Sequence, residues 1–158
     1  MKLTDIVVEK AIVPNLECTE RNDVLVALVD KLIECGAADA AIKDELIERL
    51  FERERKGSTG FGRGVAVPHV KHKGIKSMTA AIGLSEQGIE FNALDKQPVY
   101  SVFLLLSPED RPEEHLQAME AIFKNLSKDT FRRFLRQAGS VSDVTTLLDE
   151  ADHQKLGG

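Results

Sequence analysis

Cysteine is scarce in this chain of 158 residues: Cys18 and Cys35 are the only two, and they form no CxxC pair. So few cysteines in a chain of this length exclude a disulfide framework, and free thiols in a reducing compartment are the simplest interpretation. The first residues show no long apolar region with a small-residue cleavage site, so no secretory signal is predicted. We therefore expect a cytoplasmic protein.

Long hydrophobic runs are missing as well, and so is an excess of positive charge. The longest apolar stretch, Val99–Leu106, is far too short to cross a bilayer, so direct membrane insertion is not expected. The formal net charge is -5. Because proteins bind the phosphate backbone of nucleic acids through a basic face, this balance argues against nucleic acid as a partner.

The chain shows no internal repeat, low-complexity tract or linker, which predicts a single domain over residues 1–158. Its core is expected from about residue 3 to 150, before a short polar C-terminal tail. Apolar periodicity and turn residues predict these elements: a strand 11–16, helices 20–34 (capped by Thr19) and 40–55, strands 62–67, 78–84, 87–91 and 98–106, and helices 111–126, 129–137 and one from Ser140. This order predicts an α/β fold with a mixed central β-sheet sandwiched by α-helices.

A histidine follows a proline at the end of one predicted strand, in the stretch "STGFGRGVAVPHVKHK". Pro68 fixes its own φ and pushes Val67 into an extended conformation, so the strand is predicted to run into a rigid corner at His69. A side chain held there loses little freedom when it reacts, which suits a catalytic group. The alternative is a histidine that only ends the strand and bonds a carbonyl.

His115 lies near the start of the helix predicted over 111–126. It shares one helical stripe with Met119, Ile122 and Leu126, so its side chain is expected to face the core. The preceding strand, which ends near Leu106, delivers the chain to an edge of the sheet where ligand sites of α/β proteins collect. His115 is therefore either a satisfied core residue or part of a site at that edge.

Basic residues and a small polar turn follow each other at the end of the second predicted helix. Arg53 offers a fixed charge and a bidentate fork for phosphate oxygens. The turn Gly57–Gly60 adds unhindered backbone N–H groups and the hydroxyls of Ser58 and Thr59, which suit an anion. The alternative for Arg53 and Arg55 is a solvated helix end, where positive charge also complements the helix dipole.

His69, His72 and His115 are also candidates for a metal site, but no carboxylate or cysteine is spaced to complete it. Lys71 and Lys73 would repel a cation, so we expect no metal and no cofactor. A solvated loop position is the interpretation for His72.

These residues together resemble a known signature. The stretch "RERKGSTGFGRGVAVPH" (Arg53–His69) is similar to that of the phosphotransferase-system IIA proteins of the fructose/mannitol type, which include nitrogen-regulatory relatives. The later "EEHLQAM" (Glu113–Met119) resembles the second histidine segment of that family. The likeness in length and element order covers nearly the whole chain.

The resemblance implies that His69 accepts a phosphoryl group from the phosphocarrier HPr, or a nitrogen-branch equivalent, and passes it to a IIB domain. It also implies that Arg53 and His115 flank the phosphorylated ring. Read alone, Ser58 and Thr59 are candidate phosphate-binding residues through their hydroxyl or amide hydrogen-bond donors. The sequence departs from the family at Val70, where many relatives carry Gly. It also has Arg63 where Asn is commoner, a charge expected close to the phosphate.

Several functions stay open at this point. The first is a phosphocarrier in sugar uptake, and the second is a regulatory protein whose phosphorylation state selects its target proteins. A IIA-like unit with no fused IIB or IIC mildly favours the regulatory role. A family member that no longer accepts phosphate and a metal-dependent hydrolase are the remaining alternatives.

Overall fold

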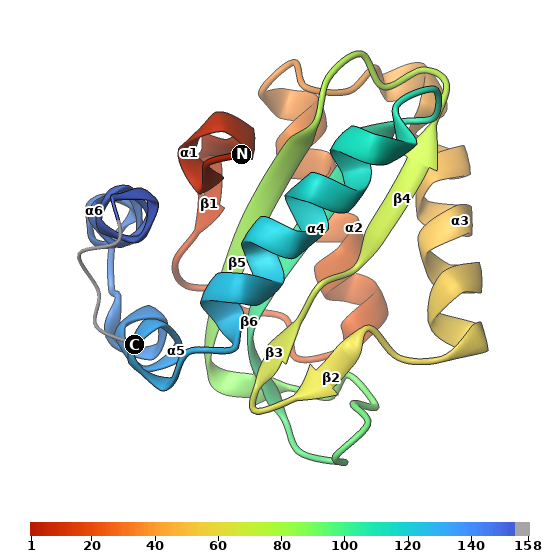
Figure 1. The fold of residues 1–158 in the computed structure, drawn as a ribbon. Coiled ribbons are helices and arrows are strands. Elements are labelled where there is room, and N and C mark those ends of the chain that lie inside the picture. Colours follow the sequence, from red (N-terminus) through yellow and green to blue (C-terminus); the bar gives the residue numbers. More distant parts are fainter. Residues whose placement is uncertain (154–158) are drawn as a thin grey trace.

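The computed structural model describes residues 1–153, which form a six-stranded mixed sheet with helices on both faces (Figure 1). The elements in chain order are α1 (Leu3–Ile6), β1 (Val7–Val13), α2 (Arg21–Glu34), a 3₁₀ turn η1 (Ala40–Ile42), α3 (Lys43–Lys56), β2 (Gly60–Gly62), β3 (Val65–Ala66), β4 (His69–His72), β5 (Thr79–Ile89), β6 (Val99–Pro108), α4 (Pro112–Leu126), α5 (Asp129–Gln137) and α6 (Val141–Asp152). Within residues 1–153, none of the helices combines the length and apolar character that a bilayer span needs.

The strands are ordered β1-β5-β6-β3-β2, and β4 also pairs with β6. β5 runs antiparallel to β6, whereas β3 and β4 are both parallel to it. These two short strands follow one another along the same edge of β6: Val65 lies opposite Ser101 and His69 lies opposite Leu105. The Val67–Pro68 segment therefore interrupts one continuous line of pairing and places His69 at the start of a new strand.

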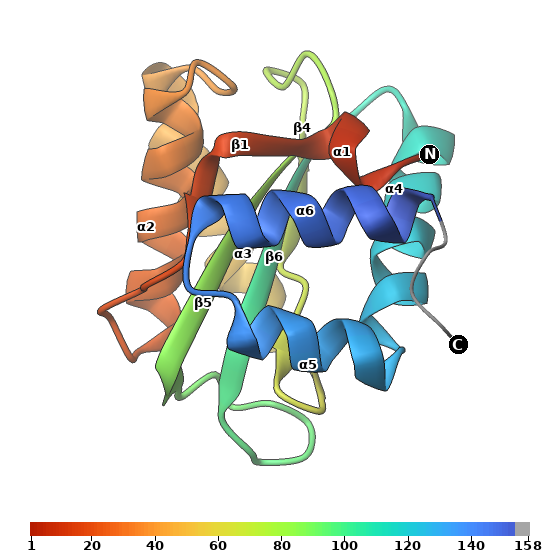
Figure 2. The ribbon, with the colours of Figure 1, turned by 90° about the vertical axis from the view of Figure 1, so that its left-hand side faces the viewer.

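Two apolar cores lie on the two faces of the sheet. Side chains alternate between faces along a strand, so Val70 and Leu104 pack with α2 and α3. Val67 and Leu105 point to the other face and pack with the helices α1, α4, α5 and α6. Figure 2 shows α2 and α4 on opposite sides of the strands. The predicted mixed sheet between helical layers is confirmed.

The bounds of the last two helices agree best with the sequence. α5 has the predicted bounds, and α6 begins after Ser140, whose Oγ accepts a hydrogen bond from the Asp143 N–H at 3.1 Å. The predicted cap of α2 is wrong: Glu20, not Thr19, occupies that position, and its side chain makes no capping bond. The first strand is also displaced, since β1 ends before Pro14, which has no N–H for a ladder.

The predicted pair of strands over 78–84 and 87–91 is one strand, β5. Its pairing with β6 shifts register between Leu84 and Ile89, where Gly88 has a φ of +99°. The Oγ of Ser85 accepts a hydrogen bond from the Gly88 N–H at 2.9 Å. The polar residues that suggested a turn therefore form an irregularity inside a continuing strand. The short elements α1 and β4 were not predicted.

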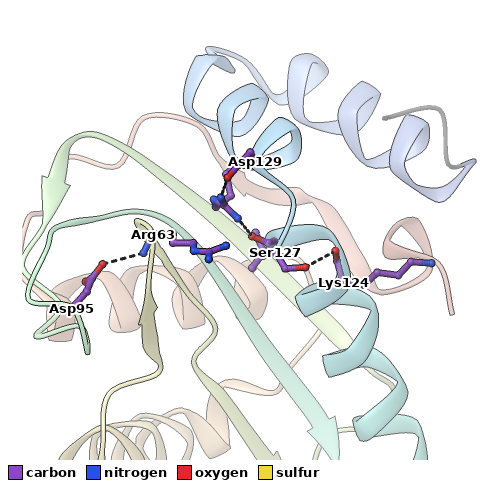
Figure 3. A network of polar contacts seen from close by, with 7 residues as sticks. Arg63, Asp95, Lys124, Ser127 and Asp129 are labelled. Carbon is purple, nitrogen blue, oxygen red and sulfur yellow. Dashed lines mark hydrogen bonds and ion pairs between the residues drawn. The ribbon is translucent and has the colours of Figure 1, made fainter. Parts of the chain in front are cut away.

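The predicted strand over 62–67 is instead a hairpin of β2 and β3. Arg63 and Gly64 have φ angles of +61° and +78°, the pattern of a tight hairpin turn. The Asp95 carboxylate accepts a hydrogen bond from the Arg63 N–H at 3.1 Å and fixes this turn (Figure 3). The partners of Val65 and His69 on β6, Ser101 and Leu105, are four positions apart, about 13 Å along the strand. Arg63 lies beyond Val65, so the expectation that its charge is close to the phosphate is wrong.

Candidate active site

His69 begins β4 at the corner made by Pro68. Its Nδ1 lies 2.8 Å from the carbonyl oxygen of Val67, and its ring is half-buried. A carbonyl only accepts hydrogen bonds, so Nδ1 must carry the proton in a neutral ring. The lone pair is therefore on Nε2. The Val67 carbonyl thus fixes the tautomer of the His69 ring.

His115 reaches the same place from the first turns of α4. The ring centroids of His69 and His115 are 5.5 Å apart. His115 is only 8% exposed, and its Nδ1 lies 2.7 Å from the Oγ of Ser107 on β6. The hydroxyl of Ser107 is fully buried and needs an acceptor, which Nδ1 supplies if it is unprotonated. The ring proton of neutral His115 is then on Nε2.

Both imidazoles are less basic than an ordinary histidine. Burial lowers the pKa of His69, and the Arg53 guanidinium lowers it further, against an opposing effect of the hydrogen bond to Val67. Burial, with the charges of Lys71 and His69, lowers the pKa of His115 to about 4. Both rings are therefore neutral near pH 7. In this state His115 offers an N–H donor and carries no positive charge.

Arg53 approaches His69 from the C-terminal end of α3. Its Nη1 donates a hydrogen bond to the carbonyl oxygen of Gly57 at 2.6 Å, across the turn that follows the helix. Its charge acts on His69, as the lowered pKa of that ring indicates. The side chain is exposed, so its other N–H groups can reach an anion at the site.

Ser58 and Thr59 lie in the turn after Arg53, but their polar groups have partners within the protein. The Ser58 Oγ accepts from the Gly60 N–H at 2.9 Å. The backbone N–H and the hydroxyl of Thr59 both bond the carboxylate of Glu54, which is only 4% exposed. Phosphate binding by Ser58 or Thr59 stays a prediction, and it would require these bonds to be exchanged.

Sequence reasoning missed Glu54. The carbonyl of Thr59 accepts from the Val67 N–H at 3.1 Å, so Glu54 is connected through Thr59 to the residue that holds the His69 ring. A carboxylate in the last turn of a basic helix, five residues before a threonine, carries no specific sequence signal. Ser107 was missed for a similar reason, because it lies at the end of an apolar run.

His72 is not a solvated loop residue. It is 2% exposed, its Nε2 lies 2.9 Å from a carboxylate oxygen of Glu45, and its Nδ1 accepts from the Gly74 N–H at 2.8 Å. Along β4, His69 and His72 lie on opposite faces. The two histidines therefore cannot ligate one metal, and His72 joins β4 to α3.

The sequence matches the family described as "Phosphoenolpyruvate-dependent sugar phosphotransferase system, EIIA 2" over residues 5–151. The chain therefore belongs to this family, and the resemblance drawn from the Arg53–His69 segment is confirmed. By this description, the family consists of EIIA components of the phosphotransferase system.

Curated relatives come from both branches of the family. A PTS system fructose-specific EIIA component of Haloferax volcanii is 33% identical over 78% of this chain and 79% of its own length. A nitrogen regulatory protein of Bradyrhizobium diazoefficiens is 32% identical over 94% of this chain and 95% of its own. The chain spans only 24% of a fructose-specific EIIABC component of Bacillus subtilis, at 28% identity.

Solved structures support the same fold. The crystal structure of nitrogen regulatory protein IIA-Ntr from Neisseria meningitidis has a TM-score of 0.82 at 31% identity, covering 91% of this chain and 97% of that one. A complex of enzyme IIA mannitol with phosphorylated enzyme IIB mannitol from Escherichia coli has a TM-score of 0.75 at 17% identity, covering 89% and 94%. The second likeness concerns the fold alone.

Proposed function

We propose that the chain is a phosphocarrier, in which Nε2 of His69 accepts a phosphoryl group from an HPr-like phosphodonor protein. It then passes the group to a sugar-specific IIB component. The observation that carries the proposal is the hydrogen bond from Nδ1 of His69 to the Val67 carbonyl, because it leaves the nucleophilic lone pair on Nε2. That nitrogen belongs to a half-buried ring beside a second neutral imidazole.

The transfer is balanced without movement of a proton. The P–N bond to the donor's histidine breaks while a P–N bond to Nε2 of His69 forms, and the donor imidazole leaves as the neutral ring. His69 keeps its Nδ1 proton, so the positive charge of the phosphorylated ring lies against the Val67 carbonyl. Phosphoryl transfer depends mainly on such positioning and on charge stabilisation.

Arg53 and His115 are suited to hold the phosphoryl oxygens. Arg53 offers a permanent charge, and the lowering of the His69 pKa by that charge supports this role. His115 offers the N–H of Nε2, because its Nδ1 is occupied by Ser107. Neutral His115 keeps this donor throughout the physiological range of pH.

The test is labelling with a radioactive phosphodonor protein. His69→Gln should take up no acid-labile label, whereas His153→Gln, which changes an exposed histidine, should be labelled like the unaltered chain. Undiminished labelling of His69→Gln would reject the proposal. His115→Ala and Arg53→Met should each slow labelling by about tenfold or more, since each removes a donor from the transferred group.

A regulatory role is the second candidate, and the likeness to nitrogen regulatory proteins over nearly the whole chain favours it. Phosphorylation would add about -1.5 to -2 charges to the surface beside His69 and thereby select target proteins. The two roles separate when a IIB component and its sugar are added to the labelled chain. Loss of label supports transport, and retained label with a target protein that binds one state supports regulation.

A further inference from the structure

Lys71 lies beside the two imidazoles, and the phosphocarrier reaction described above gives it no role. It is two residues beyond His69 on β4, and the burial of that strand alternates, so both side chains lie on the face that α4 covers. Its backbone partner on β6 is Ser107, the residue that bonds His115. Side chains of directly paired residues in parallel strands lie next to each other on one face.

The strand is held where it carries Lys71. Arg49 of α3 donates a hydrogen bond from Nη1 to the carbonyl oxygen of Lys71 at 2.6 Å. The Lys71 side chain itself is exposed, and no ion pair is formed by it within residues 1–153. Its ammonium is therefore available to an incoming anion.

The electrostatics of the site agree with this placement. The charge of Lys71 lowers the pKa of both His69 and His115, whereas the charge of Arg53 lowers that of His69. Lys71 is thus the cation on the His115 side of the reacting ring, and Arg53 approaches from α3. An ammonium is a compact charge with three donors and complements the fixed fork of a guanidinium.

We propose that Lys71 supplies a second cation of the phosphoryl site and that its ammonium contacts the phosphoryl oxygens once they are on His69. The inference rests on the proposed acceptor role of His69. In the labelling reaction, Lys71→Met should shift the equilibrium between donor and chain toward the donor by about twofold to fivefold, the range for an exposed charge. Lys71→Arg should recover most of this loss, because it restores the charge.

Lys73→Met is the matched control, since Lys73 is an exposed lysine in the turn that follows β4. It should leave the labelling equilibrium unchanged. In the unphosphorylated chain, nuclear magnetic resonance titration should show a higher pKa of His115 in Lys71→Met than in Lys73→Met. This shift reports the position of the charge and would not follow from a structural role alone.

The outcomes separate the two proposals. If the unaltered chain takes no label on His69, the acceptor role fails and the role of Lys71 falls with it. If the chain is labelled but Lys71→Met and Lys73→Met reach the same equilibrium, only the role of Lys71 is overturned. An unchanged pKa of His115 in Lys71→Met would equally overturn its placement beside the imidazoles.

Discussion

Acidification should weaken the fold through His115. Its ring is 8% exposed, and in the tautomer assigned above Ser107 donates to Nδ1, so a proton added at Nδ1 would break that hydrogen bond. The pKa of His115 is about 4 in the folded chain, chiefly because burial disfavours the charged ring. In the unfolded chain the ordinary value of about 6.5 applies.

The sign follows from these two values. Between about pH 6.5 and pH 4 the unfolded chain binds a proton at His115 that the folded chain does not, so the free energy of unfolding falls as the pH falls. The gap would correspond to about 3 kcal/mol at about 1.4 kcal/mol per pH unit. Solvent reaches this site, because the neighbouring His69 is only half-buried. The burial effect on His115 is therefore discounted to about 1–2 kcal/mol.

Urea unfolding from about pH 7 to about pH 4 measures the effect. Carboxylates contribute to any acid destabilisation, so the comparison is with His115→Gln, whose amide can accept from Ser107 but does not titrate. The unaltered chain should lose about 1–2 kcal/mol more than this variant. Equal losses, or a resonance of His115 that titrates near its ordinary pKa, would refute the reasoning.

Three further substitutions test the supports of the site by urea unfolding. Glu54→Ala should lower the free energy of unfolding by about 2–4 kcal/mol, because it leaves the N–H and the hydroxyl of buried Thr59 without their acceptor. A loss smaller than that caused by a substitution at an exposed position would contradict this. Gly64→Ala should cost about 1–2 kcal/mol, since φ is +78° and the new Cβ would lie 3.2 Å from a tyrosine ring; an unchanged midpoint would exclude that strain. His72→Leu should cost about 1–2 kcal/mol, more than Glu45→Ala, because only the first leaves the Gly74 N–H unbonded; the reverse order would count against this assignment.

The sequence predicted the helical half of the fold better than the strands. α5 and α6 are marked by breakers and by the Ser140 cap, which act locally and can be read locally. The residues 85–87 resemble a turn, yet β5 continues through them because pairing with β6 resumes at Ile89. Such pairing between distant segments overrides local propensity.

The short paired strands are the main part of the fold that the sequence did not predict. The hairpin turn at Arg63 places a non-glycine residue at positive φ, which no rule of composition would favour. β4 is short and covers only His69–His72. It forms because β6 is long enough to pair with β3 and then with β4. Without β4, the sequence had no reason to place His72 inside the molecule.

The candidate site was predictable where a rigid corner and a helical stripe could be read, and these are the positions of His69 and His115. Their partners were not predictable, because Ser107, Glu54 and Lys71 become neighbours of the histidines only through the register of β4 on β6 and the turn after α3. A period of two along β4 does relate Lys71 to His69, once that strand is known.

The lowered basicity of both imidazoles has a chemical consequence for the proposed transfer. An acceptor nitrogen needs a lone pair and a donor nitrogen needs a proton, so protonation of either ring would disturb its role. Val67 and Ser107 fix the two tautomers, with the proton on Nδ1 in His69 and on Nε2 in His115. Positive charge for the phosphoryl group then has to come from side chains that stay charged near neutral pH. Arg53 and Lys71 are of that kind, and the same charges help to keep the rings neutral.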